Sequence, residues 1–424
     1  MKDKKYICVM FPYPSGDGLH VGHAYNYAVV DSYARWQRYK GIEVFQPFGY
    51  DAFGLPAENY ARKHNREPRE VTYENINKFR VQMKKMNTEY EEKLITSDPS
   101  YYRWTQWLFK KLYEKGLAYK KMGPVNYCPS CETVLANEQV KEGKCERCSS
   151  VVETKEMNQW YFKITDYKER LIKNLEWIDY PEKTKKQQMH WLENLNDWCV
   201  SRQRKWGCPI PIEGEEDTLD TFVCSSFYYL RYLDPDNENE LFDKSKYKQV
   251  DLYIGGNEHA CMHLIYARFI NMFLYDLGIV PEEEPFKKLI HQGMITHKGE
   301  KMSKTKGNVI NPDNYDPDEL RMYLMFIGHY FDGGDWDDSK MNGIKRFIGR
   351  FERWVKLATS SGESIDTAKM KEQIDGYVES FKFNKVVSTW MEFYNKNKNI
   401  VMDEKTAEDL IKMFKVFVPG FEIN

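Results

Sequence analysis

The sequence has no long apolar segment. Across its 424 residues no run of about 18 apolar residues occurs, and no apolar stretch precedes Tyr6, where the first strand is expected. We therefore expect neither a membrane span nor a signal peptide, no membrane partner, and a cytoplasmic location. Internal repeats and low-complexity segments are absent as well, which leaves a globular organisation.

A strong charge of one sign is also missing. Lys and Arg number 62 against 64 Asp and Glu, and the formal net charge is −2. No global field therefore marks the protein as a nucleic-acid binder, so a tRNA or DNA partner would have to be met by local basic patches. The length suffices for two or three domains with real cores, and a hydrophobic fraction of 42% is ordinary for such domains.

Cysteines are few, but four of them are paired in sequence. Of the nine cysteines, Cys128 and Cys131 form one C-x-x-C pair, and Cys145 and Cys148 form a second one thirteen residues later. In a chain expected in a reducing compartment, this spacing indicates four thiolates around one Zn²⁺. A site with four protein ligands leaves no open coordination position, so the zinc is predicted to be structural and to stabilise a small β-ribbon.

A loop rich in Pro and Gly follows the first apolar run. The run Tyr6–Met10 predicts a buried strand, and apolar residues at helical spacing predict a helix over 24–39. His20 and His23 stand at the expected helix start, where backbone N–H groups and the helix dipole favour an anion. Two imidazoles at that position could hydrogen-bond the phosphates of a nucleotide.

The next segment completes a strand–helix–strand unit. Val44-Phe45 predicts a second strand, and Asp51 follows in the loop, beyond the carboxyl end where open α/β sheets place ligands. A free carboxylate there could hold an ammonium group, or Asp51 could be an ordinary loop or helix-capping residue. Residues 59–125 are expected to be mostly helical because they are rich in Lys and Glu with spaced apolar positions.

A basic turn lies between two tryptophans. Arg202, Arg204 and Lys205 stand between Trp198 and Trp206. Two interpretations are open: a solvated basic turn, or a surface that meets the end of a nucleic acid through charge and stacking.

A second strand–turn–helix follows. The run 250–254 predicts a strand, and 255–259 opens a helix predicted to reach Asn271. Glu258, at the end of the strand, could accept ribose hydroxyl groups, as an acid does in dinucleotide folds. His259 and His263 share one helix face. They lack the companion residues of an H-E-x-x-H metal site, so we expect them in the core or in a substrate pocket.

A lysine-rich loop follows a further strand predicted over 289–294. Four lysines lie between His297 and Gly307, with glycines at both ends and hydroxyl residues between them. The segment is either an exposed basic loop or a mobile flap that brings ammonium groups to a phosphate ester. From Met341 onward the apolar spacing predicts amphipathic helices.

These pieces together resemble a class I aminoacyl-tRNA synthetase of the leucyl-tRNA synthetase type. The resemblance rests on the H-V-G-H sequence at 20–23, on K-M-S-K-T at 301–305, and on the stretches at 11–16, 51–58, 200–204 and 253–263. It covers about residues 6–418. It implies an α/β fold, a split Rossmann-type parallel-sheet catalytic domain with an inserted zinc ribbon and a C-terminal α-helical bundle.

The resemblance also implies a domain order. The expected segments are the first half of the nucleotide-binding domain at 1–122, the zinc ribbon at 123–157, a remnant connective segment at 158–198, the second half at 199–295, the lysine loop with a stem-contact region at 296–340, and a truncated helical bundle at 341–424.

Roles for individual residues follow from the same resemblance. Catalysis is expected from His20, His23, Lys301 and Lys304, and ATP binding from Gly22, Gly255, Gly256, Glu258, His259, Met302 and Ser303. Leucine is expected to contact Met10, Phe11, Tyr13, Asp51, Phe222, Tyr228 and His263. Contact with the tRNA end is expected from Arg202, Arg204 and Trp206. The implied cofactors are ATP, Mg²⁺ and structural Zn²⁺, and the protein is expected to be a monomer.

The sequence departs from the family in several places. Only six residues separate Trp191 from Trp198, so the large editing domain of the family has no room there, and the chain ends part-way through the helical bundle. Cys224 and Phe227 replace an expected Glu and Trp, and Thr305 replaces a Ser.

Three hypotheses follow from this pattern. The first is a compact leucine–tRNA ligase without editing. The second is an adenylate-forming paralogue that passes leucine or a related amino acid to another acceptor. The third, a catalytically idle regulatory module, is disfavoured because the histidines, both signature lysines, Asp51 and Glu258 are all present.

Overall fold

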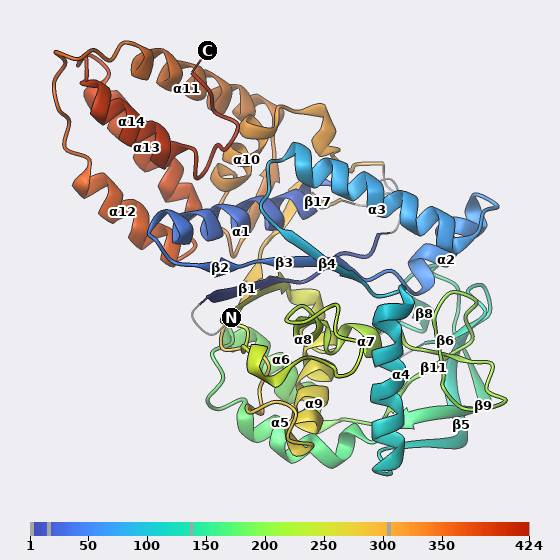
Figure 1. Cartoon of the computed structure of the whole chain (residues 1–424). Helices are drawn as coiled ribbons and strands as arrows, with labels where there is room; N and C mark the ends of the chain where they lie inside the picture. Colours follow the sequence, from blue (N-terminus) through green and yellow to red (C-terminus); the bar gives the residue numbers. More distant parts are fainter. Residues whose placement is uncertain (1–3, 15–17, 136–138, 303–306, 424) are drawn as a thin grey trace. The chain divides into compact units, whose positions relative to one another are not determined.

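The computed structural model describes residues 4–14, 18–135, 139–302 and 307–423. The chain divides into two compact units, and each unit is assembled from segments far apart in the sequence (Figure 1). Unit 1 comprises Met1–Asp17, Pro47–Asn77 and Glu91–Ile290, and unit 2 comprises Gly18–Gln46, Lys78–Tyr90 and His291–Asn424. Ser303, Lys304 and Thr305 of the lysine loop lie outside the described residues.

The centre of unit 1 is a parallel strand pair. Strand β1 (Lys5–Val9) pairs with β14 (Leu252–Gly256), with Ile7 opposite Leu252 and Val9 opposite Ile254. Apart from Lys5, both strands are apolar and buried, as expected for parallel strands covered on both faces. The first strand is therefore confirmed. The strand predicted at 250–254 begins two residues later than expected.

A second parallel pair in unit 1 places Asp51. Strand β3 (Pro47–Tyr50) pairs with β4 (Glu91–Ile95), and Asp51 follows β3 directly. The loop after β3 is fixed by a hydrogen bond from Asp51 N to Pro12 O (3.0 Å). Strand β4 was missed by the sequence analysis because its first residues are charged and exposed. The helices expected between 59 and 125 are α2 (Leu55–Lys63), α3 (Pro68–Lys85) and α4 (Pro99–Glu114).

Helix α9 (His263–Asp276) lies in the core of unit 1. Its residues from His263 to Leu274 are all buried, and it starts later than predicted because a 3₁₀ turn (Asn257–His259) follows β14. The helix carries a fully buried ion pair, in which Arg268 donates twice to Glu284 at 2.7 Å. Arg268 also donates to Gln188 and to the carbonyl of Leu171. Such a pair tolerates burial only because its remaining donors are also satisfied.

An antiparallel ribbon extends from unit 1. Strand β5 (Ala118–Cys128) runs beside β9 (Glu153–Phe162) over their whole lengths, and β6 (Thr133–Leu135) and β10 (Trp198–Cys199) flank them (Figure 1). A short hairpin of β7 (Val140–Lys141) and β8 (Lys144–Cys145) completes it. The predicted ribbon is thus confirmed.

The remaining elements of unit 1 are short. They are α5 (Lys168–Asn174), α6 (Glu182–Glu193), α7 (Thr221–Ser225), α8 (Tyr228–Arg231), and a small sheet in which β13 (Thr218–Leu219) lies between β11 (Ser201–Arg202) and β12 (Cys208–Pro209). Strand β15 (Leu289–Gln292) lies beside β14.

Unit 2 is mainly helical. Helix α1 (Val21–Tyr39) packs on α10 (Pro317–Phe326), and a buried ion pair joins them, in which Arg321 donates to Asp31 at 2.8 Å. Arg321 also donates to Ser32 Oγ and to the carbonyl of Met86. A small sheet of β16 (Met294–His297), β17 (Glu300–Lys301) and β18 (Gly333–Trp336) and the short strand β2 (Val44–Phe45) belong to the same unit.

The predicted C-terminal helices form a bundle within unit 2. They are α11 (Asp338–Lys356), α12 (Ala368–Glu379), α13 (Phe383–Asn397) and α14 (Glu404–Phe414), coloured orange to red in Figure 1. Phe347, Phe351 and Trp354 lie on one face of α11, where Phe351 packs on Trp390 and Phe414. No helix within the described ranges is long and apolar enough to cross a membrane.

Candidate active site

A small cavity in unit 1 gathers the side chains predicted to bind the amino acid. All seven of them lie in its wall together with two further residues: Met10, Phe11, Tyr13, Asp51, Phe222, Ser225, Tyr228, His259 and His263. They come from β1 and the loop after it, the loop after β3, α7, α8, and the segment that leads into α9. The cavity measures about 20 Å³, room for about one water molecule, so a larger ligand must push the surrounding side chains apart.

Asp51 is a buried carboxylate whose hydrogen-bond partners are all neutral. Its side chain is 2% exposed and accepts hydrogen bonds from Thr221 Oγ1 at 2.9 Å and Thr96 Oγ1 at 3.3 Å. Burial raises the pKa of Asp51 to about 7, because neither hydroxyl compensates fully for lost solvation and the nearby Asp220 adds repulsion. A carboxylate held in this state would be stabilised by an ammonium group.

The inner end of the cavity is a chain of hydrogen-bonded rings. The ring of Phe11 stacks on Tyr228 at 3.8 Å, and Tyr228 Oη lies 2.7 Å from Tyr253 Oη. Tyr253 Oη in turn lies 2.6 Å from His263 Nε2. Burial lowers the pKa of His263 to about 3, so the imidazole is neutral. The wall is therefore uncharged and suits an apolar side chain.

Two residues of the cavity, His259 and Ser225, were not predicted to bind the amino acid. His259 was predicted to bind ATP, but the structure places it in the wall beside the amino-acid residues, and its buried Nδ1 has no hydrogen-bond partner. An unsatisfied buried nitrogen at a cavity wall is a ready contact for a polar ligand atom. Ser225 was missed; its position one helical turn after Thr221 was the available signal.

Two glycines shape the end of β14. A Cβ atom at Gly255 would lie 2.0 Å from Met10 Sδ, and one at Gly256 would lie 2.1 Å from Glu258 Oε2. Any side chain at these positions would therefore displace the cavity wall or the Glu258 carboxylate. Glu258 itself is exposed, at the position where a ribose contact was predicted.

In unit 2, the two histidines cap the start of α1. Gly22 N donates to His20 Nδ1 at 3.0 Å, and His20 N donates to His23 Nδ1 at 3.3 Å. The two rings stack with their centroids 3.8 Å apart. Because each Nδ1 accepts a hydrogen bond from a backbone N–H, each neutral ring carries its proton on Nε2, which makes Nε2–H the donor toward a ligand. A Cβ at Gly22 would lie 2.8 Å from the ring of His20.

The described part of the lysine loop is a hairpin of β16 and β17. Lys298 and Gly299 form its turn with positive φ angles, and Asp335 Oδ1 accepts from Gly299 N at 2.8 Å and from Thr296 Oγ1 at 2.6 Å. Lys301 is exposed at its end, and the half-buried Met302 follows. The predictions for Ser303 and Lys304 fall outside the described residues.

The arginines predicted to meet the tRNA end have partners inside unit 1, which corrects that expectation. Arg202 is 6% exposed and donates to Asp220 Oδ2 at 2.7 Å. Arg204 is buried and donates to Glu58 Oε2 at 3.1 Å. Both guanidinium groups are needed to pair buried carboxylates, so neither forms a nucleic-acid surface. Sequence spacing could not show this, because Glu58 lies 146 residues before Arg204.

Trp206 supports the loop that carries Asp51. Its indole Nε1 donates to the carbonyl of Ala52 at 2.7 Å, and its backbone N donates to Glu58 Oε1 at 3.0 Å. Its ring packs on Phe53 with centroids 5.1 Å apart. The half-buried Trp206 therefore holds the loop that carries Asp51 in place.

The four predicted metal ligands meet in the ribbon. The sulfur atoms of Cys128, Cys131, Cys145 and Cys148 all lie within 4.8 Å of one another. Cys131 N donates to Cys128 Sγ at 3.4 Å, which stabilises a thiolate. Tetrahedral zinc with Zn–S bonds of about 2.3 Å requires sulfur atoms roughly 3.8 Å apart, so the cluster fits this ion.

The cysteine cluster packs against the Asp51 loop. Leu55, four residues after Asp51, is 8% exposed and shares an apolar cluster with Cys128, Cys131 and Cys145. Arg204 adds a polar link, since it donates both to Glu58 and to the carbonyl of Cys131 (3.3 Å). The ribbon thus supports the amino-acid cavity.

Two models of known protein families match this chain. A model described as tRNA synthetases class I (I, L, M and V) matches residues 1–218, about half of the chain, and one described as tRNA synthetases class I (M) matches residues 135–343. The chain belongs to the class I tRNA synthetases. The resemblance noted in the sequence is therefore confirmed, and the cavity, the histidine pair and the lysine hairpin lie in a synthetase framework.

Curated relatives of this synthetase chain are leucine–tRNA ligases. That of Clostridium kluyveri is 33% identical over 689 aligned positions, which cover 99% of this chain and 85% of the relative. That of Clostridium botulinum (strain Hall) is 32% identical over 692 positions with the same coverage. Because this chain has only 424 residues, more than two hundred positions of each alignment have no counterpart in it.

Solved synthetases share the fold. A leucyl-tRNA synthetase of Agrobacterium radiobacter K84, determined as a ternary complex with tRNA and LeuAMS, matches with a TM-score of 0.89 and 26% identity over 99% of this chain and 84% of that one. The methionyl-tRNA synthetase of Mycobacterium tuberculosis matches with a TM-score of 0.79 at 18% identity over 98% of this chain and 92% of that one, which shows the fold alone.

Proposed function

We propose that this synthetase activates leucine with ATP and transfers the leucyl group to the 3′ end of a leucine tRNA. The observation that carries the proposal is the cavity, where one buried carboxylate, Asp51, stands beside an uncharged ring-lined wall. That pairing suits an apolar α-amino acid bound by its ammonium group and its side chain. The leucine–tRNA ligase relatives support the same substrate.

In the proposed first step, the leucine carboxylate attacks the α-phosphorus of ATP. A new O–P bond forms as the bond to pyrophosphate breaks, and leucyl-adenylate and pyrophosphate result. No protein base is required, because the carboxylate is already ionised; the protein contributes positioning and electrostatic stabilisation. In the second step, a terminal ribose hydroxyl of tRNA attacks the acyl carbon, and AMP leaves.

Particular residues are assigned to the charges that develop. Nε2–H of His20 and of His23 donate to phosphate oxygens, and Lys301 and Lys304 neutralise pyrophosphate as it leaves. Glu258 accepts the ribose hydroxyls, and Gly22, Gly255, Gly256, Met302 and Ser303 complete the nucleotide contacts. Mg²⁺ accompanies ATP and neutralises its phosphates.

We also propose that the protein lacks hydrolytic editing. More than two hundred aligned positions of the relatives have no counterpart in this chain. At the place where the family carries its editing domain, only six residues lie between Trp191 and Trp198. Fidelity would then depend on the cavity, and an apolar pocket separates side chains that differ by one methylene by only about 1–3 kcal/mol. A tRNA charged with norvaline should therefore persist when incubated with the protein, and its rapid deacylation would contradict this part.

The test is amino-acid-dependent ATP–pyrophosphate exchange across the apolar amino acids, followed by leucylation of a leucine tRNA transcript. Leucine should support the fastest exchange, and the transcript should be charged. Exchange without charging would replace the proposal by the alternative of a non-tRNA acceptor, and no exchange with any amino acid would refute both.

The role proposed for His23 is tested by a substitution at that residue. His23→Ala should lower the exchange rate by about 100- to 1,000-fold, the cost of one donor to developing charge. His64→Ala, at an exposed position at the end of α2, is the matched control and should leave exchange unchanged.

A further inference from the structure

The hairpin that carries Lys301 in unit 2 is held at its turn by a residue with no role in the reaction proposed above. Strands β16 and β17 are joined by the two residues Lys298 and Gly299, whose φ angles are both positive (56° and 74°). Positive φ at both central residues is what the type I′ turn of a tight hairpin requires. Lys298 is not a glycine, so it adopts this conformation only where surrounding contacts stabilise the turn.

Asp335, on strand β18, provides such a contact. Its Oδ1 accepts hydrogen bonds from Gly299 N at 2.8 Å and from Thr296 Oγ1 at 2.6 Å. The hydrogen bond from Thr296, followed by that from Gly299, lowers the pKa of Asp335, so the side chain is ionised and is a strong acceptor. One carboxylate oxygen therefore joins the turn of the hairpin and its first strand to the neighbouring strand.

The strand register places Asp335 and Lys301 in one row across the sheet. Strand β16 lies in the middle, with Thr296 opposite Asp335 on one side and opposite Lys301 on the other. Residues opposite one another in a sheet point to the same face, so the three side chains share a face. Two strand spacings separate Asp335 from Lys301 by roughly 10 Å, too far for an ion pair. Any influence of Asp335 on the position of Lys301 therefore passes through the hairpin.

The other end of the hairpin is tied to the start of α1, where His20 stands. Asn308 Nδ2 donates to the carbonyl of Lys301 at 3.3 Å. Two residues after Asn308, the carbonyl of Ile310 accepts a hydrogen bond from Val21 N at 3.1 Å, directly after His20. These contacts connect Lys301 with the histidine at the helix start, and Asp335 fixes the hairpin at its opposite end.

We propose that Asp335 is a positioning residue, which holds the hairpin of β16 and β17 so that Lys301 reaches the pyrophosphate of ATP. The inference rests on the role proposed above for Lys301 in leucine activation. Without the carboxylate, Gly299 N loses the acceptor that the structure shows, and the turn at Lys298 can open. The ammonium group of Lys301 is then displaced, and a displacement of about 1 Å can lower a rate by about 100-fold.

The first test compares Asp335→Ala with Asp335→Asn in ATP–pyrophosphate exchange. Asp335→Ala should lower kcat by about 10- to 100-fold. Its KM for leucine should stay within twofold, because the amino-acid cavity lies in unit 1. Asp335→Asn keeps a side-chain oxygen that can accept both hydrogen bonds, so its kcat should stay within about threefold of the parent. The matched control is Asp409→Ala, at an exposed position on α14, and should leave exchange unchanged.

A double-mutant cycle with Lys301→Ala separates positioning from a general effect on the fold. Lys301→Ala alone should lower the exchange rate by about 100- to 1,000-fold, the cost of one donor to developing charge. If Asp335 acts through Lys301, adding Asp335→Ala to Lys301→Ala should lower the rate by less than about twofold more. Thr296→Val removes one of the two hydrogen bonds and should show the same pattern with a smaller effect, about 2- to 10-fold.

The outcomes separate this inference from the proposed function. If Lys301→Ala slows exchange but Asp335→Ala does not, the positioning role is wrong and the proposed function stands. If the two effects multiply in the double variant, Asp335 acts independently of Lys301 and the inference is overturned. An Asp335→Asn variant as slow as Asp335→Ala would also overturn it, because the negative charge and not the acceptor would then matter. If Lys301→Ala leaves exchange unchanged, the role proposed for Lys301 fails and this inference fails with it.

Discussion

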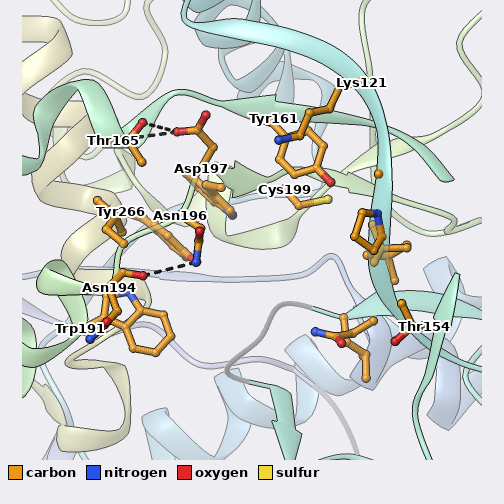
Figure 2. A pocket seen from close by; sticks show the side chains of 18 of the residues that line it. Lys121, Thr154, Tyr161, Thr165, Trp191, Asn194, Asn196, Asp197, Cys199 and Tyr266 are labelled. Carbon is orange, nitrogen blue, oxygen red and sulfur yellow. Dashed lines mark hydrogen bonds between the residues drawn. The ribbon is translucent and has the colours of Figure 1, made fainter. Parts of the chain in front are cut away.

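The amino-acid cavity differs in size and in polar groups from a large groove beside the ribbon in unit 1. The cavity measures about 20 Å³; in its wall Tyr228 and His263 are linked through Tyr253, and the buried His259 Nδ1 has no hydrogen-bond partner. The groove measures about 880 Å³, and its lining includes the half-buried Trp191 and the exposed Lys121, Asn194 and Asn196 (Figure 2). The two share one wall, through Tyr266 and Phe222.

The cavity suits a small amino acid, which is distinguished by its shape and by one charge, because the cavity combines a ring-lined wall with the buried Asp51 carboxylate. Leucine must push the side chains of this wall apart, since the cavity holds only about 20 Å³. Changes in the cavity should therefore act on the activation of leucine.

The largest effect is expected from Asp51→Asn. Leaving a bound ammonium group without its buried partner should lower kcat/KM for leucine by about 1,000-fold in pyrophosphate exchange. Binding of tRNA should stay within twofold, because Asp51 is buried and is assigned to the leucine ammonium group. The exposed Asp236→Asn is the control. Loss of tRNA binding in Asp51→Asn would mean that the effect of this change is not confined to the cavity.

The pH dependence of leucine use should follow Asp51. Burial raises the pKa of Asp51 to about 7, and only the ionised form attracts an ammonium group, so kcat/KM for leucine should fall about tenfold per unit below pH 7. A raised carboxyl pKa also means that the folded state binds this proton more tightly than the unfolded chain does.

The contribution of Asp51 to stability is accordingly present in full below about pH 4 and is lost as the pH rises to 7. Asp51→Asn should remove this dependence and unfold at a higher temperature than the parent at pH 8. A flat profile of kcat/KM down to pH 6 would show that Asp51 does not bind the substrate ammonium.

Removal of zinc by a chelator should affect both regions, because both rest on the ribbon. Leu55 joins the metal cluster to the Asp51 loop, and Leu135 packs on the same cluster and lines the groove. We expect one zinc per chain by metal analysis, a melting temperature lowered by several degrees after removal, and a raised KM for leucine. An unchanged KM in metal-free, folded protein would show that the ribbon does not support the cavity.

The smallest effect is expected from Trp206→Phe. This change keeps the ring but removes the hydrogen bond to the carbonyl of Ala52, worth about 1 kcal/mol, so the KM for leucine should rise about fivefold. The KM for ATP and the affinity for tRNA should not change. Trp107→Phe, at a half-buried position on α4, is the control. If Trp206→Phe changed tRNA charging alone, Trp206 would contact the tRNA end, as the sequence analysis predicted, and would not support the Asp51 loop.

The local features were predictable from the sequence because they depend on neighbours along the chain. The strand at β1, the histidines at the start of α1 and the pair of C-x-x-C sequences were placed correctly. Asp51 lies beyond the end of a strand as expected, but that strand is β3, which was not predicted, and not Val44-Phe45. Strand β4 was not predicted either, since its charged first residues do not carry the alternation of a half-buried strand. The start of α9 was missed because a 3₁₀ turn intervenes.

The sequence by itself was enough to indicate the family, the four cysteines that cluster in the ribbon and the seven residues that line the small cavity of unit 1. Only the tertiary structure decided that Arg202 and Arg204 pair with buried carboxylates, that His259 and Ser225 line the cavity, and that Tyr266 lines a large groove. The physical reason is the same in each case. Whether a cation faces solvent or a carboxylate depends on a partner such as Glu58, 146 residues away from Arg204, and only folding brings the two together.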